Sequence, residues 1–303
     1  MYITFSRILI YEDLINLMEV FMFRNLLILL LVIGFQTQYA NAANYKLIEL
    51  TPDYEHTKFS PECSEFEKQF RAYTTCFDTK EDDGEAWGIP DFVSYEMREY
   101  IGKLPKGPKR PSPWITEKEM AKQGLAPTDA SYKHTREFLK THPNWYDRGH
   151  LAMKQHAWRQ GPNADWNTHT VINAIPQRHK FNAGIWLNME DKTADWADEF
   201  GKVWIIAGPI FYDGEPKAWL GEAEKGEMLI AIPDGAFKII IREDGDCLKV
   251  LAFIYPQHEE GYGRGPYDHE KYQVSVDEIE ALTGLDFKFP ENLESTAATE
   301  IWD

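Results

Sequence analysis

The chain has 303 residues, of which 43% are hydrophobic and 14% aromatic, so it carries enough apolar side chains for a large buried core. This composition excludes an intrinsically disordered protein. The formal net charge of −17 excludes a protein that attracts polyanions through its overall charge, so any such attraction has to be local.

The first 42 residues have the pattern of a targeting segment. Arg24 precedes an apolar run, and Ala40 and Ala42 are small residues placed as a signal peptidase requires. We predict an upstream extension and signal peptide over 1–42, cleavage after Ala42, and a secreted or periplasmic protein. A retained anchor is the alternative. The run is short for a membrane span and no second hydrophobic stretch follows it, so we expect no stable membrane anchor after cleavage.

Residues 43–90 form a polar N-terminal segment with two of the three cysteines, Cys63 and Cys76. In an oxidising compartment these two would close a short disulfide loop and leave Cys247 free. Three reduced, buried thiols are the alternative.

The next elements alternate between strand and loop patterns. Residues 91–97 have the composition of a strand. Residues 102–114 hold four prolines, two glycines and four basic residues without an acidic one, which predicts an irregular, positively charged surface loop. Such a loop is usually only solvated, and it is also a candidate second contact for a polyanion.

Further strands and helices follow along the chain. Residues 168–177 read as a strand ended by Pro176, 179–200 as a helix, and 202–211 as a buried strand stopped by Gly208-Pro209. Residues 227–244 read as two strands that turn at 233–235, and 247–257 as another. A helix is predicted to start at Ser275, with a capping box, and to end at Gly284. This order predicts an α+β domain over 91–303, with a largely antiparallel sheet flanked by helices.

Positive charge is concentrated in residues 131–180. This window has eight basic and three acidic residues, a net charge of +5, and six of the nine histidines. A local positive field within an acidic protein suits a substrate that carries phosphate.

The window contains the sequence Asp147-Arg148-Gly149-His150. On an extended segment Arg148 and His150 point to the same face, where a guanidinium can hold phosphate oxygens and an imidazole can take a proton near neutral pH. Gly149 would keep the backbone open to a bulky ligand. The alternative is a structural ion pair between neighbouring Asp and Arg side chains.

A second group of polar residues follows at Asn173, Asn182 and Glu190. In a regular helix Asn182 and Glu190 lie about 80° apart and share one broad face. An amide oxygen and a carboxylate suit Mg²⁺ that keeps most of its water. The alternative for such an Asn is a buried hydrogen-bonding residue.

Six motifs occur in a fixed order along the chain. They are DRGH at 147–150, N-x-x-P-Q at 173–177, N-x-x-x-W-x-x-x-E at 182–190, AGPIF at 207–211, IPDGAFK at 232–238 and SVDEIEALTGLDF at 275–287. Together they resemble the sugar-non-specific DNA/RNA endonucleases, the ββα-metal (His-Me finger) nucleases that include the endonuclease G branch. The resemblance runs from about Phe92 to Pro290 and does not cover 43–90.

The resemblance implies a role for each residue of the motifs. His150 would be the general base that activates water, and Arg148 would stabilise charge on the scissile phosphate. Asn182 would be the direct ligand of Mg²⁺, with Mn²⁺ as an alternative, and the metal would stabilise the leaving group. Glu190 would orient water in the metal shell, and Asn173 would lie beside the phosphate or the metal.

Other positions follow less directly. Arg178 and Lys180, which belong to the basic window, are expected to bind substrate, whereas Asp147 is expected to be structural. Many relatives carry an arginine about one helical turn after the glutamate, but this chain has Ala194 there, with Lys192 as the nearest basic residue. Relatives usually also carry a second arginine that contacts phosphate, upstream of the DRGH motif. Lys109, Arg110 or Arg136 could take its place in this chain.

The leading hypothesis is a secreted, Mg²⁺-dependent endonuclease that acts on DNA and RNA without base recognition. The resemblance also allows a homodimer, since relatives are often dimers. One alternative is a non-catalytic nucleic-acid-binding module of the same fold, which the arginine missing at Ala194 would favour. Another is a phosphodiesterase that acts on small substrates such as nucleotides.

Overall fold

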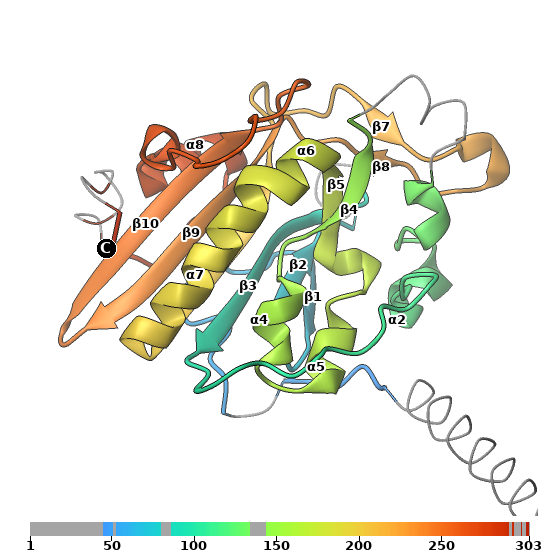
Figure 1. Ribbon diagram of the computed structural model, residues 1–303. Helices are drawn as coiled ribbons and strands as arrows, with labels where there is room; N and C mark the ends of the chain where they lie inside the picture. Colours follow the sequence, from blue (N-terminus) through green and yellow to red (C-terminus); the bar gives the residue numbers. More distant parts are fainter. Residues whose placement is uncertain are drawn as a thin grey trace, which may run out of the picture. The chain divides into compact units, whose positions relative to one another are not determined.

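Six antiparallel strands form the sheet on which the molecule is built (Figure 1). The computed structural model describes residues 45–50, 53–79, 86–133, 144–290, 293, 298 and 301–302. All of the elements named below belong to one compact unit, Lys46–Asp303. The predicted signal segment, 1–42, lies outside the described residues.

The sheet has the strand order β1-β2-β3-β6-β9-β10, and each pair of neighbours is antiparallel. The strands are β1 (Phe66–Gln69), β2 (Thr74–Phe77), β3 (Pro90–Arg98), β6 (Lys202–Ile210), β9 (Gly235–Asp244) and β10 (Cys247–Pro256). The longest pairing is the β9–β10 hairpin, which runs from Asp244 opposite Cys247 to Gly235 opposite Pro256. The predicted α+β fold with a largely antiparallel sheet is confirmed.

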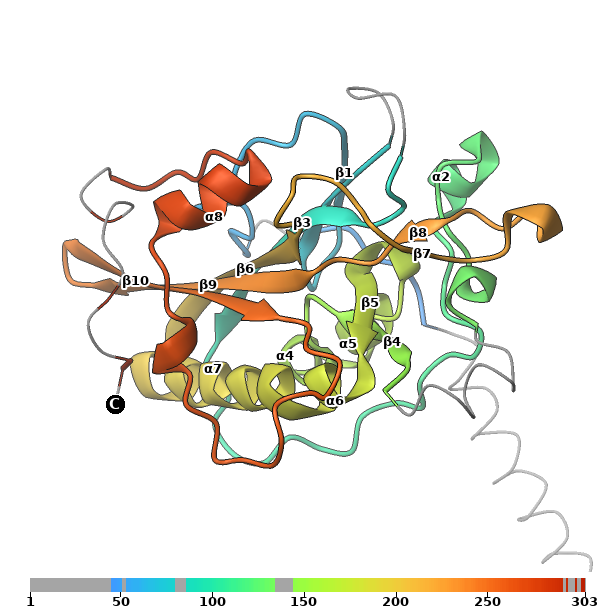
Figure 2. The same ribbon diagram turned by 90° about the horizontal axis from the view of Figure 1, so that it is seen from above.

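Both faces of the sheet are covered, and its central strands are therefore apolar on both sides. In β6, Val203 and Ile205 pack into a core with helix α7 (Leu187–Phe200), whereas Trp204 and Ile206 pack into a second core with helix α8 (Val276–Thr283). Successive side chains of a strand point to opposite faces, so one apolar strand supplies both cores. Figure 2 shows α7 and α8 on opposite sides of the sheet.

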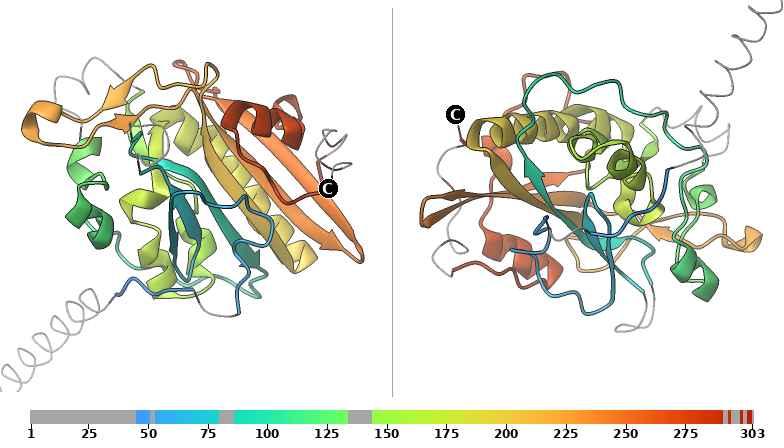
Figure 3. Two further views of the ribbon diagram at one scale, coloured as in Figure 1. Left: turned by 180° about the vertical axis from the view of Figure 1, so that it is seen from behind. Right: turned by 90° about the horizontal axis from the view of Figure 1, so that it is seen from below.

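Two details of the predicted strands are wrong. Gly208 and Pro209 do not stop β6, which continues to Ile210, with Pro209 opposite Ala236. Gly208 is required there because a side chain would collide with the Asp91 carbonyl oxygen. The turn at 233–235 does not join a hairpin either, since β8 (Ile230–Ala231) pairs with β7 (Trp219–Leu220) in a separate small sheet, seen from behind in Figure 3.

The polar N-terminal segment contributes β1 and β2 to the main sheet, next to β3. A disulfide joins Cys63 to Cys76 of β2, with their Cα atoms 5.5 Å apart, and Cys247 is free and exposed. Within the described residues no helix is long and apolar enough to cross a membrane.

A second, two-stranded sheet carries the DRGH motif. It pairs β4 (Tyr146–His150) with β5 (Ala174–Arg178) and leads into α6 (His179–Phe181), a π-helical turn, η3 (Asn182–Trp186), and α7. This is the ββα arrangement that the resemblance implies. The strand predicted over 168–177 is confirmed only in its second half, because 171–173 form the 3-10 turn η2 (Val171–Asn173).

The remaining helices are short and connect the strands. They are α2 (Lys118–Gln123), α4 (Lys154–Trp158), α5 (Pro162–Asn167), and the 3-10 turns η1 (Asp129–Tyr132), η4 (Ala223–Lys225) and η5 (Glu270–Tyr272). Helix α8 has the predicted ends, since the Ser275 hydroxyl accepts a hydrogen bond from the Glu278 N–H and Gly284 adopts a left-handed conformation (φ 71°).

Candidate active site

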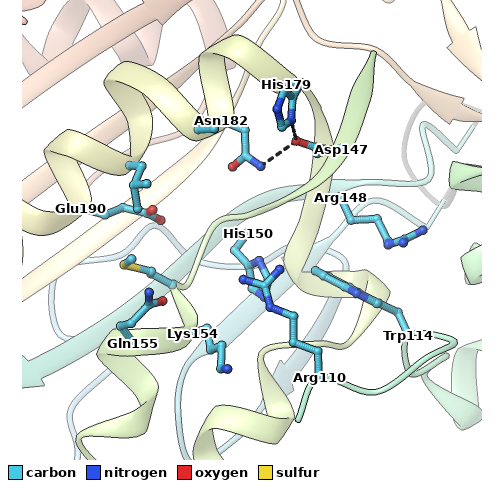
Figure 4. A pocket seen from close by; sticks show the side chains of 13 residues that line it. Arg110, Trp114, Asp147, Arg148, His150, Lys154, Gln155, His179, Asn182 and Glu190 are labelled. Carbon is cyan, nitrogen blue, oxygen red and sulfur yellow. Dashed lines mark hydrogen bonds and ion pairs between the residues drawn. The ribbon is translucent and has the colours of Figure 1, made fainter. Parts of the chain in front are cut away.

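A pocket lies where β4, the α6–α7 helix, α4 and the 102–114 loop meet (Figure 4). It is lined by Arg110, Trp114, Asp147, Arg148, His150, Met153, Lys154, Gln155, His179, Asn182, Ala183, Leu187 and Glu190. Four of the residues predicted for the site, His150, Arg148, Asn182 and Glu190, are therefore brought together. They come from positions up to 42 residues apart in the sequence.

The β4–β5 pair holds His150 and Arg148 at the pocket wall, with His150 opposite Ala174 and Gly149 opposite Ile175. The expected role of Gly149 is wrong. A Cβ at this position would lie 2.2 Å from the buried side chain of Gln177, so the glycine makes room for protein rather than for a ligand.

His150 is half-buried, and its ring lies against Trp114 (ring centroids 4.6 Å apart) and His169 (5.1 Å). Its backbone carbonyl accepts a hydrogen bond from Trp186 Nε1 (3.2 Å). Burial of the ring, with added repulsion from His169 and Arg110, lowers the pKa of His150 well below 6.5. The imidazole is consequently neutral at pH 7 and able to accept a proton.

Arg148 forms an ion pair, although not with its sequence neighbour Asp147. Its Nη1 lies 3.1 Å from Asp129 Oδ1, and its guanidinium carbon lies 5.4 Å from the centre of the Trp114 ring. Asp129 Oδ1 also accepts a hydrogen bond from the Trp114 backbone N–H (3.1 Å). Figure 4 shows Arg148 extending toward Trp114, with His150 between it and the side formed by Asn182 and Glu190.

Asp147 orients the predicted metal ligand. Its Oδ2 accepts hydrogen bonds from Asn182 Nδ2 (3.2 Å) and His179 Nδ1 (2.8 Å), and its Oδ1 accepts one from Trp145 Nε1 (2.9 Å). Because the Asn182 amide nitrogen is engaged, its carbonyl oxygen is turned away from Asp147 (Figure 4). Asp147 thus has the structural role expected for it, and it performs this role within the site by holding Asn182.

The helix that carries Asn182 and Glu190 is not regular between them. The π-helical turn includes Gly184, whose φ and ψ of −112° and −113° are not helical. The chain is therefore kinked at this turn, and the 80° expected from a regular helix does not apply between Asn182 and Glu190. Both side chains nevertheless line the same pocket.

Glu190 is buried beside a buried lysine of β9, Lys238. Lys238 Nζ lies 4.0 Å from Glu190 Oε1 and 4.0 Å from the centre of the Trp186 ring. Burial raises the pKa of Glu190 and lowers the pKa of Lys238, and the charge of each residue opposes the shift in the other. Among the described residues nothing hydrogen-bonds to Glu190 Oε1 or to Lys238 Nζ.

His156 fixes the backbone of Glu190. Its Nε2 donates to the Glu190 carbonyl oxygen (2.9 Å), and its Nδ1 accepts from the Tyr95 hydroxyl (2.9 Å). Burial lowers the pKa of His156 to about 3, so this histidine is neutral. No local pattern predicts the contacts of Lys238 and His156, because both connect residues more than 30 positions apart.

The donor set fits a hard divalent cation. Asn182 offers a carbonyl oxygen, and Glu190 offers a carboxylate oxygen that accepts no hydrogen bond from the described residues; Mg²⁺ accepts such ligands while it keeps several waters. The described residues contain no group of three or more His, Cys, Asp or Glu side chains placed to hold a metal ion. Asn182 and Glu190 by themselves would leave a bound cation with most of its water ligands.

Asn173 does not lie at the pocket, which corrects the expectation that it contacts phosphate or metal. It is fully buried, and its side chain bonds to the backbone of Ala152 (2.9 and 3.0 Å) and to the Thr168 carbonyl oxygen (2.8 Å). Asn173 thus holds the chain that follows His150.

The expected substrate contacts Arg178 and Lys180 also lie outside the pocket lining. Arg178 packs over the Tyr146 ring (5.0 Å), and Lys180 Nζ donates to the Glu260 carbonyl oxygen (3.2 Å). The pocket's further cations are instead Arg110 and Lys154.

These cations bear on the arginine missing at Ala194. Lys192 does not replace it, since Lys192 lies over the Trp196 ring (5.7 Å). Of the upstream candidates, Arg110 lines the pocket, Lys109 does not, and Arg136 lies outside the described residues.

Comparison with known proteins agrees with this geometry. The model of the DNA/RNA non-specific endonuclease family matches residues 73–294. The chain is 28% identical over 163 residues to the mitochondrial nuclease EXOG of Danio rerio, covering 52% of this chain and 45% of that protein. It is 26% identical over 230 residues to the Xenopus laevis EXOG (68% and 62% covered). A nuclease of Nostoc sp. is 31% identical over 159 residues (47% and 50%).

The chain thus spans about half the length of the curated relatives it matches. The fold is also similar to that of one chain in the crystal structure of the EndoG/EndoGI complex, which describes the mechanism of EndoG inhibition. The TM-score is 0.58 at 17% identity, over 76% of this chain and 89% of that one. Because the family model covers most of the sequence, from β2 to beyond α8, this chain belongs to the DNA/RNA non-specific endonuclease family.

Proposed function

We propose that the protein is an endonuclease that hydrolyses phosphodiester bonds of DNA and RNA and requires Mg²⁺. The observation that carries the proposal is the meeting of His150, Arg148, Asn182 and Glu190 at one pocket. Family membership supports the reaction class, since relatives that match this chain are named nucleases.

The residues divide the chemistry among them. Neutral His150 takes a proton from a water molecule, whose oxygen forms a bond to phosphorus as the bond from phosphorus to the 3′ oxygen breaks. The leaving 3′ oxygen keeps the electron pair and takes a proton from a second water molecule, and the other product is a 5′-phosphate end. Arg148 and Arg110 stabilise the charge that develops on the phosphate oxygens. A divalent cation held by Asn182 and Glu190 would stabilise charge on the phosphate and on the leaving oxygen.

Cleavage is proposed to be independent of base sequence. The pocket's cations, Arg110, Arg148 and Lys154, suit phosphate oxygens, and contacts to phosphate carry no sequence information. The affinity for substrate should therefore be dominated by phosphate contacts and fall as salt is raised.

The test is cleavage of plasmid DNA and of RNA by the wild-type protein and His150→Ala, with Mg²⁺ and with a chelator. We expect Mg²⁺-dependent cleavage of both substrates by the wild type, and a loss of about 10²- to 10⁴-fold in the variant, which lacks the general base. Replacing Mg²⁺ by Mn²⁺ should retain activity. No cleavage by the wild type, or equal cleavage by the variant, contradicts the proposal.

A non-catalytic nucleic-acid-binding module is the second candidate, and the alanine at position 194 favours it. It predicts retention of DNA without strand scission and without need for Mg²⁺. A phosphodiesterase of small substrates would instead turn over a dinucleotide faster than long DNA, so a comparison of kcat/KM on the two substrates separates it from the leading candidate.

We also propose that the protein is exported, with cleavage after Ala42, to the periplasm or the medium. The pattern of residues 22–42 supports export, whereas the EXOG relatives are named mitochondrial. Sequencing the N-terminus of the native protein tests it, since export predicts a chain that begins at Ala43. A homodimer is the proposed assembly, and light scattering of the purified protein tests it.

A further inference from the structure

The loop from Gly102 to Trp114 is a positively charged segment at the edge of the pocket. It carries Lys103, Lys106 and Lys109, all exposed, and it reaches the pocket through Arg110 and Trp114. From the end of β3 the loop passes α4 and α5 on its way to α2 (Figure 1). The feature to explain is why a chain of net charge −17 collects four cations and no carboxylate here.

The inner side of the loop is fixed to α4 and α5. Trp158 Nε1 donates to the Pro105 carbonyl oxygen (2.7 Å), and Lys154 Nζ donates to the Pro108 carbonyl oxygen (3.3 Å). A Cβ at Gly107 would lie 3.2 Å from Asp165 Oδ2, so the backbone is close to α5 at this point. With four prolines and these contacts, the loop loses little conformational entropy when it binds a partner.

The carboxylates that border the loop face cations other than the three loop lysines. Asp165 faces Lys154 (3.7 Å), and Asp198, which accepts from the Tyr100 backbone N–H, is paired with Arg159. In the described parts of the chain, no Asp or Glu forms an ion pair with the three loop lysines. Among the described residues, their charges are therefore not neutralised by a carboxylate.

The spacing of the lysines favours a partner with charges repeated along a line. Lys103, Lys106 and Lys109 are three residues apart, and in the polyproline II conformation that proline-rich chains favour, three residues span about 9 Å and return the side chain to the same side. A nucleic-acid strand carries one phosphate at every nucleotide, so its backbone fits a row of cations.

We propose that Lys103, Lys106 and Lys109 form a docking surface for the sugar-phosphate backbone of the nucleic acid, adjoining the scissile phosphate in the pocket. This rests on the proposed nuclease function and extends it. The surface lengthens the site on the Trp114 side, and it favours long substrates over short diesters.

The test compares the triple variant Lys103→Gln/Lys106→Gln/Lys109→Gln with the parent, both in a His150→Ala background that keeps the DNA intact. Fluorescence anisotropy gives the Kd for a labelled duplex over a range of salt concentrations. We expect the triple variant to raise Kd at least tenfold. The slope of log Kd against log salt should fall by about 2.7, which corresponds to three lost phosphate contacts.

A matched control removes the same charge from exposed lysines elsewhere, in Lys225→Gln/Lys249→Gln/Lys288→Gln. It should leave the slope within experimental error of the parent. In the active background, kcat/KM for long DNA relative to that for bis(p-nitrophenyl) phosphate should fall at least tenfold in the loop variant only.

Equal effects of the two triples, or no change in slope for the loop variant, overturn the docking surface. Failure of the His150→Ala parent to bind DNA also overturns the docking surface, and an acidic protein would then be the better partner for the loop. A wild-type protein that binds DNA through the loop but never cleaves it contradicts the proposed nuclease function and leaves the docking surface standing.

Discussion

Replacing Asp147 by Ala should weaken metal binding without removing any metal ligand. Asp147 Oδ2 holds the Asn182 amide nitrogen, and this contact turns the Asn182 oxygen toward the pocket. Without it the amide can rotate and present either its nitrogen or its oxygen. The protein would then lose the part of the binding free energy that depends on a fixed orientation.

The size of the effect follows from the kind of contact. A hydrogen bond to a charged acceptor contributes about 1.5–3 kcal/mol, and loss of a partner of a metal ligand costs about 10- to 100-fold in affinity or activity. The Asp147 side chain is 27% exposed, and solvent screening reduces its contribution. We therefore expect the Mg²⁺ concentration for half-maximal cleavage to rise about 10- to 30-fold in Asp147→Ala.

The assay is the rate of plasmid cleavage as a function of Mg²⁺ concentration. Saturating Mg²⁺ should restore most of kcat, because His150 and Arg148 are unchanged. His179→Ala is the matched control, since it removes a second partner of Asp147 and leaves the Asn182 contact in place. An unchanged Mg²⁺ dependence in Asp147→Ala, or an equal shift in both variants, refutes the orienting role.

Three further predictions concern the base, the buried lysine and the disulfide. The pKa of His150 lies below 6.5, so the imidazole stays neutral as the pH falls to that value. The loss of kcat/KM on the acid side should therefore occur below pH 6.5 in the wild type. A loss that begins above pH 7 would contradict the lowered pKa of His150. Lys238→Met leaves Glu190 buried without its counter-charge, so the free energy of unfolding measured by urea denaturation should fall by about 3–5 kcal/mol. Adding Glu190→Gln should restore part of this free energy, and no recovery would argue against the ion pair. Reducing the disulfide between Cys63 and Cys76 opens a loop with a sequence separation of 13 and should lower the free energy of unfolding by about 3 kcal/mol; an unchanged urea midpoint in dithiothreitol would refute this.

Local sequence patterns predict the elements of this fold well where one physical cause dominates. The ends of α8 follow from Ser275 and Gly284, whose preferences depend on the nearest backbone groups alone. The strand at 202–211 follows from an unbroken apolar run. The same run does not say where the strand ends, because β9 supplies the hydrogen bonds that carry β6 past Pro209.

For the candidate site, too, the sequence predicts some features and not others. The DRGH sequence and the positions of Asn182 and Glu190, taken together with the family resemblance, predict the groups that meet in the pocket. Their supports are not visible in the sequence, because Asp129 pairs with Arg148 across 19 positions and Lys238 reaches Glu190 across 48. Such contacts depend on how distant elements pack, and no periodicity within one segment encodes them.

The acidity of the chain is compatible with a polyanionic substrate because electrostatic interactions in salt solution are short-ranged. At physiological ionic strength the screening length is about 8 Å, so a phosphate in the pocket interacts mainly with the cations that line it. Arg110, Arg148 and Lys154 supply that local field, while carboxylates elsewhere on the surface are largely screened. On the rest of a long nucleic acid, only carboxylates within that screening length act, and they oppose binding away from the pocket and its basic loop.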